Sequence, residues 1–94
     1  MKKDVIQNEE RLNKINKIIS NLKIELQKLK DERENIILLN KYYGSTTWYK
    51  DIENFDEGKY GKINAGVLSE DAIWNMNENI NELKKEIQDI KITE

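Results

Sequence analysis

Apolar residues recur every seven positions through the first half of the chain, and this repeat most constrains how the sequence can fold. Two interleaved series make it up, namely Val5, Leu12, Ile19 and Leu26, and then Ile15, Leu22, Leu29 and Ile36. Residues three and four positions apart share one face of a helix, so the two series form a single apolar seam. The seam predicts a long coiled-coil-like helix over residues 4–43, with Asp4 capping its start.

A second heptad repeat occupies the last part of the chain. Its members are Ile73, Ile80 and Ile87, with Met76, Leu83 and Ile90. The repeat predicts a returning helix over residues 69–91, with Ser69 as its N-cap and Asp71 near the positive end of the helix dipole. We therefore expect an all-α fold, a helical hairpin whose last helix runs antiparallel to the first.

Between the two repeats the character of the sequence changes at YYGSTTWYKD, residues 42–51. Gly44 can end the long helix in the left-handed conformation, and Ser45 can cap a short helix over residues 45–56. A glycine-containing loop that includes Gly66 is expected over residues 57–68.

We expect one small helical domain over residues 1–94, which is lean in apolar residues for its size, at 37% hydrophobic. An antiparallel last helix would cover the seam back only to about Ile19, and Val5, Leu12 and Ile15 would lack a partner. The sequence therefore predicts an oligomer that self-associates through these three residues. A fold-back of the linker onto them is the alternative.

Composition argues against several function classes. The chain has no cysteine and no histidine, so disulfides, thiolate metal sites and the commonest general base are excluded. A net charge of −2 gives no bulk attraction to nucleic acid. No residue pattern indicates a catalytic site, a metal or a cofactor. The chain lacks an apolar run long enough to span a membrane and an apolar signal core, so we expect a cytoplasmic protein.

Aromatic residues gather in the middle of the chain beside acidic ones. Tyrosine and tryptophan are enriched in binding hot spots, so the interaction candidates are Tyr42, Tyr43, Trp48, Asp51 and Tyr60. Trp48 and Trp74 can instead be core residues that plug the open end of the hairpin. We expect Trp48 to pack on the start of the last helix and Asp51 to accept hydrogen bonds from loop amides.

Two sequence blocks, YYGSTTWYKD and GVLSEDAIW, resemble a family of small bacterial proteins catalogued as domain of unknown function 4298. The resemblance covers residues 40–77, and it implies an intact domain without assigning an activity. Secreted helical hairpins of the WXG type also have about this length and a tryptophan in the turn. Here, however, Tyr49 and Lys50 follow Trp48, so the glycine of that motif is missing.

The function that these features favour is a non-catalytic protein–protein interaction module. It would be an adaptor, a chaperone-like partner or a small inhibitor, of the kind that bacteria or their phages encode. The alternative is an oligomer that binds a small, nucleotide-like ligand at the aromatic and acidic turn. An enzyme is the third choice.

Overall fold

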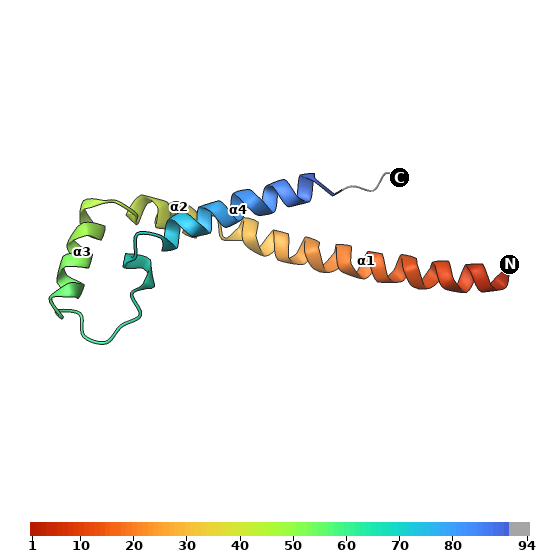
Figure 1. Ribbon diagram of the computed structural model, residues 1–94, viewed down its shortest axis with the longest axis horizontal. Coiled ribbons are helices and arrows are strands. Elements are labelled where there is room, and N and C mark those ends of the chain that lie inside the picture. The colour runs from red at the N-terminus through yellow and green to blue at the C-terminus, as the bar shows by residue number, and fades with distance from the viewer. Residues whose placement is uncertain (91–94) are drawn as a thin grey trace. The chain divides into compact units, whose positions relative to one another are not determined.

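The structure is a computed structural model that describes residues 1–90. Its elements follow in the order α1 (Lys2–Asp31), α2 (Arg33–Tyr42), α3 (Thr46–Asp56), the short 3₁₀ helix η1 (Gly66–Leu68) and α4 (Ala72–Gln88) (Figure 1). Residues 1–90 contain no strand. The predicted all-α class, with a long helix followed by shorter ones, is confirmed.

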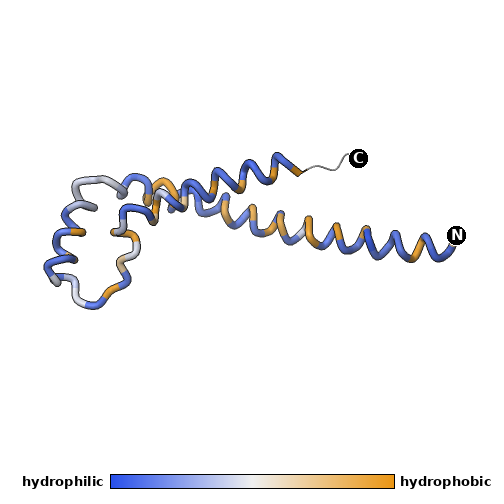
Figure 2. Tube along the Cα trace, in the orientation of Figure 1, coloured by the Kyte–Doolittle hydropathy of each residue, from blue (hydrophilic) through white to orange (hydrophobic). Residues whose placement is uncertain are grey.

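The contacts of the chain group into two units, Met1–Ile36 and Ile37–Glu94, whose boundary falls inside α2. The sequence predicted one domain over residues 1–94; this grouping of contacts does not decide the number of domains, so that stays a prediction. No residue of α1 is buried. Apolar positions recur at regular intervals along this helix (Figure 2).

The helix that the sequence predicted over residues 4–43 is divided at Glu32 into α1 and α2. The backbone N–H of Glu32 donates to the carbonyl of Leu29, only three residues earlier, at 3.1 Å. The N–H of Ile36 then donates to the carbonyl of Glu32 at 3.0 Å, which restores the α-helical spacing. A single tight turn therefore interrupts the helix without a glycine or a proline.

The turn after α2 forms as the sequence predicted. Gly44 has a φ of +75°, a left-handed conformation that favours glycine. Ser45 is the N-cap of α3, and its side chain accepts a hydrogen bond from the N–H of Trp48 at 3.1 Å. One residue thus ends a helix and the next begins another.

Two predicted caps differ from the structure. Asp4 lies in the first turn of α1, whose N-cap position is Met1. Ser69 does not begin α4, because Asp71 occupies the N-cap position; the Ser69 hydroxyl accepts a hydrogen bond from the N–H of Ala72 at 3.2 Å. The predicted end of this helix, residue 91, lies outside the described residues.

Within the second unit, α4 runs antiparallel to the end of α2. The side-chain amides of Asn40 and Asn77 exchange two hydrogen bonds, at 2.7 and 3.3 Å. Further along, the hydroxyl of Tyr43 donates to the backbone carbonyl of Glu70 at 2.6 Å. The residue numbers rise on α2 while they fall on the α4 side, so the two segments run in opposite directions.

The core of the second unit is small. Trp48 and Ile73, at 4% and 3% exposure, are the buried hydrophobic residues of the described chain. η1 contacts both α3 and α4, so it lies between the two helices that carry these residues. None of the helices in residues 1–90 combines the length and the apolar character that a transmembrane helix needs.

Candidate functional site

Asp51 of α3 is the centre of a cluster of polar side chains, the Asp51 cluster, which also contains Tyr42, Asn54 and Tyr60. The Tyr42 hydroxyl donates to Oδ2 of Asp51 at 2.5 Å, and the Tyr60 hydroxyl donates to Oδ1 at 2.7 Å. The side-chain amide of Asn54 donates to the Tyr60 oxygen at 3.0 Å. The cluster therefore ties the end of α2 and the loop after α3 to one carboxylate.

The cluster changes the pKa values of two of its members. The pKa of Tyr42 is raised from its ordinary 10.0 to about 12, first by loss of solvent around the phenol and then by its hydrogen bond to Asp51. The pKa of Asp51 is lowered because the hydroxyls of Tyr42 and, second, Tyr60 donate to its charged form. At neutral pH the cluster is thus a charged carboxylate that accepts hydrogen bonds from two tyrosine hydroxyls.

Asp51 does not accept the loop amides that the sequence predicted. Tyrosine hydroxyls take that place, because the turn at Gly44 brings Tyr42 against α3 and the loop returns Tyr60 to the same helix. Both oxygens of Asp51 already have a donor from within the chain. The cluster therefore joins segments of the second unit, and it does not present an unpaired carboxylate.

The indole of Trp48 makes one hydrogen bond and two aromatic contacts within the second unit. Its indole Nε1 donates to the backbone carbonyl of Val67 at 3.0 Å, which ties α3 to η1. The rings of Tyr43 and Tyr49 meet the indole edge to face, with centroids 5.1 and 4.9 Å away. Trp48 is consequently a core residue, one of the two roles that the sequence left open.

Trp74 is not a core residue. Although the sequence paired it with Trp48 as a plug of the hairpin end, its side chain is 55% exposed. The preceding residue of α4, Ile73, is the buried one. A step of one residue rotates a helix by about 100°, so Trp74 faces away from the core that Ile73 enters.

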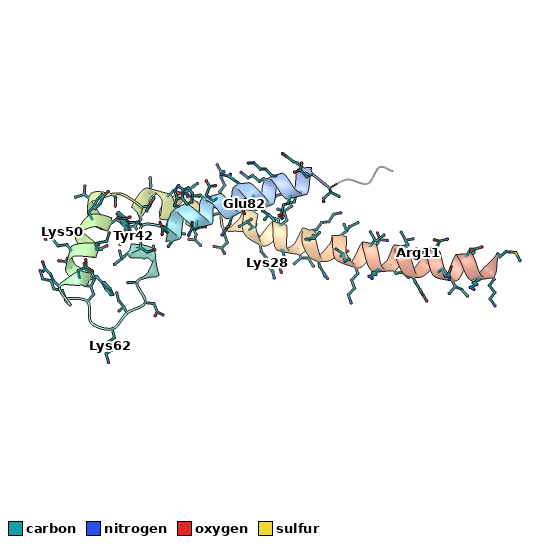
Figure 3. All side chains as sticks on the ribbon, in the orientation of Figure 1. Arg11, Lys28, Tyr42, Lys50, Lys62 and Glu82 are labelled. Atoms are coloured by element: carbon teal, nitrogen blue, oxygen red, sulfur yellow. The ribbon has the colours of Figure 1, made fainter. Side chains whose placement is uncertain are left out.

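The five interaction candidates therefore fall into three groups. Trp48 is buried, and Tyr42, Tyr43 and Asp51 are half-buried with their polar groups bonded inside the chain. Tyr60 stays exposed although its hydroxyl bonds to Asp51. Figure 3 shows Tyr42 on the inner side of the second unit, whereas Lys62 points away from it.

Among the residues predicted as turns and caps, Gly66 opens η1 without a positive φ. The left-handed glycines of the loop after α3 are Gly58 and Gly61. The residues that the sequence missed are Asn40, Asn54 and Asn77, which contribute the amide bonds described above. Asn40 carried a signal, because it stands at the next heptad position after Arg33 in the seam, and a seam asparagine often sets helix register.

The residues predicted for self-association lie in α1. Val5, Leu12 and Ile15 are 62%, 52% and 55% exposed. Three further seam residues are also more than a third exposed, namely Ile19, Leu22 and Leu26. The exposed apolar stripe is thus longer than the three residues that the sequence singled out.

The described chain, residues 1–90, contains no group of three or more acidic side chains placed to hold a metal ion. Its charged groups pair only at the surface, as Lys28 does with Glu25 at 3.0 Å in α1. Two regions remain distinctive, namely the Asp51 cluster with its packed aromatics and the exposed seam of α1.

Comparison with known proteins identifies the family. The sequence model of a family described as Domain of unknown function (DUF4298) matches residues 6–90 of the 94-residue chain. The match extends beyond the two blocks at residues 40–77 and takes in most of α1. No curated protein and no solved structure matches the sequence. The chain belongs to the DUF4298 family, which carries no assigned activity.

Proposed function

We propose that this protein is a non-catalytic protein–protein interaction module that binds another protein chain through the seam of α1. One observation carries the proposal. A helix of 30 residues carries a heptad pattern that is apolar at every position except Asn8, yet no residue of the helix is buried within the chain. Exposed leucine and isoleucine rows of this length are costly in water, at about 25 cal/mol for each Å² of apolar surface.

The pattern of the exposed residues favours a helical partner. Seven-residue spacing keeps the apolar positions on one side of the helix over its whole length, as in helices that pack in coiled coils. The second unit supports the same function differently. The Asp51 cluster and the packing of Trp48 hold the short elements of this unit together. The second unit is therefore a folded segment that follows the seam in the sequence.

The aromatic turn, which the sequence favoured as the binding surface, is less suited to that role. The indole of Trp48 and the hydroxyls of Tyr42 and Tyr43 are used within the second unit. A small ligand that stacks on these rings would have to displace those contacts. The nucleotide-like ligand remains a prediction, and no contact in the described residues favours it.

Two residues of α1 allow a matched test. Leu22 lies in the seam and Ile24 lies on the opposite side of the helix, yet they are 60% and 55% exposed. A photo-crosslinking amino acid is placed at one or the other position in cells that carry the protein. We expect covalent adducts with a protein chain from position 22 and few from position 24.

The size of the adduct identifies the partner as another protein or as a second copy. Leu22→Glu should abolish adducts from a crosslinker placed at Ile15, whereas Ile24→Glu should leave them unchanged. Adduct yields that are equally low at positions 22 and 24 would refute the proposed function.

A further inference from the structure

The charges that flank the seam indicate which protein covers it. In a two-stranded coiled coil, the residues beside the apolar positions on each helix face the partner and decide its orientation. On one side of the seam these residues are Asp4, Arg11, Ile18 and Glu25; on the other they are Lys2, Glu9, Asn16, Lys23 and Lys30. Each side carries positive and negative charges, so the charges of one α1 can be compared with those of a second, identical α1.

We infer that the seam of α1 packs against α1 of a second copy of this chain, with the two helices antiparallel. The inference rests on the proposed function, since it names the partner of the same surface. In this register residues of one apolar series lie opposite residues of the other, except that Leu26 lies opposite Asn8. The layers pair Val5 with Leu29, Leu12 with Leu22, Ile15 with Ile19, and Asn8 with Leu26 of the second copy.

The flanking charges complement one another in that arrangement. Arg11 faces Glu25 of the second copy, and Glu9 faces Lys23 of the second copy. The two-fold symmetry repeats each pair, which makes four attractive contacts about the middle of the helix. Near the ends of the helix, Lys2 faces Lys30 of the second copy, which makes two repulsive contacts, so attraction exceeds repulsion within α1. Opposite charges at these positions favour the orientation that brings them together.

The same symmetry gives a role to an isoleucine outside the two apolar series. Ile18 is 51% exposed in α1. In the antiparallel pair it lies beside the two-fold axis and meets Ile18 of the second copy. The dimer buries this apolar side chain beside the two-fold axis. A charged residue at position 18 would instead face the same charge on the second copy.

A parallel pair fits less well. It would bring Asp4 against Glu9 of the second copy, twice, and would place Lys23 beside Ile18. Its attractive pair, Glu25 with Lys30, is also made twice and does no more than offset the repulsion. Like charges at facing positions lower the stability of that orientation.

Another antiparallel register, shifted by one heptad, also matches charges. It would, however, place Asn8 opposite Arg33 of the second copy, past the end of α1 at Asp31 and the tight turn at Glu32. The favoured register also contains an Asn8 layer, but it sets Asn8 opposite Leu26, inside the continuous helix. The register that lies wholly within α1 is therefore favoured.

Contacts inside the single helix do not prevent this pairing. Arg11 donates to the side chain of Asn8 at 2.9 Å, and Glu25 pairs with Lys28 at 3.0 Å. Both contacts join exposed residues three positions apart, and such pairs contribute only about 0.2–0.5 kcal/mol. Figure 3 shows Arg11 projecting from α1.

The first test is a charge exchange, read by analytical ultracentrifugation of the full chain. Arg11→Glu and Glu25→Arg should each weaken the dimer about tenfold, because each turns two attractive contacts into repulsive ones. The double variant restores both contacts with reversed signs, so its dissociation constant should return to within about threefold of the wild type. Lys17→Glu, the same kind of charge reversal on the far side of the helix, is the matched control.

The second test reads orientation directly. The chain has no cysteine, so Ile15→Cys and Ile19→Cys variants each carry one thiol. When the two are mixed and oxidised, antiparallel pairing predicts disulfides between the two variants, because residue 15 lies opposite residue 19. A parallel pair would join each variant to itself, and that result would overturn the inference.

The outcomes separate this inference from the proposed function. A chain that stays monomeric in the ultracentrifuge, while position 22 still forms adducts with another protein, refutes the second copy and keeps the interaction module. A monomer without adducts refutes both. A double variant that dimerises as weakly as the single ones refutes the antiparallel register.

Discussion

The hydroxyl of Tyr42 donates a hydrogen bond to the carboxylate of Asp51, nine residues later, across an O···O distance of 2.5 Å. This contact joins the last residue of α2 to α3 over the turn at Gly44. Short hydrogen bonds to a charged oxygen are among the stronger ones in proteins. Both partners titrate, so the contact can be followed by changing the pH.

At alkaline pH we expect Tyr42 to ionise well above the ordinary pKa of tyrosine. Its folded pKa of about 12 lies above the ordinary 10.0, so the folded state keeps a proton that the unfolded state releases. This contribution to stability is complete below pH 10 and is lost as the pH rises to about 12. Absorbance titration of tyrosinate should show one late step that Tyr42→Phe removes and Tyr49→Phe, an exposed control, leaves in place.

At acid pH the sign is opposite for Asp51. Its pKa is lowered in the folded state, so its contribution to stability is complete above the ordinary value of 3.8 and is lost as the pH falls below it. Asp51→Asn should lower the melting temperature at neutral pH, and the difference from wild type should shrink below pH 3.8. Glu53→Gln, the equivalent change at an exposed acid of α3, is the control; an effect as large as that of Asp51→Asn would contradict the assignment.

Substitution of the two tryptophans should have unequal effects. Trp48→Ala removes one of the two buried hydrophobic side chains together with its bond to Val67, so we expect a loss of about 3 kcal/mol or unfolding of the second unit. Trp74→Ala should change the free energy of unfolding by less than about 0.5 kcal/mol. Chemical denaturation followed by far-ultraviolet circular dichroism measures both.

Fluorescence gives an independent reading of the same difference. In Trp74→Phe the remaining Trp48 should emit at short wavelength and resist quenching by iodide. In Trp48→Phe the remaining Trp74 should emit as an indole in water. Equal quenching of the two would contradict the burial of Trp48.

Gly44 should contribute to stability because of its backbone conformation, and not because a side chain at this position would clash. An added Cβ at Gly44 meets nothing within 4 Å, but its φ of +75° is strained for other residues. Gly44→Ala should therefore cost about 1 kcal/mol. Gly66→Ala is the matched control, since that position is equally open and has no positive φ; thermal melts that shift equally for both would show that conformation is not the cause.

The helices and the first turn could be predicted because the forces that form them are local. Heptad spacing marks a helical face within a few residues, Gly44 and Ser45 end one helix and start the next by their own backbone and side chain, and YYGSTTWYKD marked the family. The division at Glu32 escaped prediction, because neither glycine nor proline marks it.

Only the tertiary structure decided which distant groups meet. Whether Trp48 or Trp74 enters the core depends on the rotation of α3 and α4 about their axes, and the donors to Asp51 depend on where the loop returns Tyr60. The amino-acid sequence by itself determined the helices, the turn and the apolar seam, since each depends on neighbours along the chain. The tertiary structure decided which side chains are buried or paired, because those contacts join residues that the sequence keeps far apart.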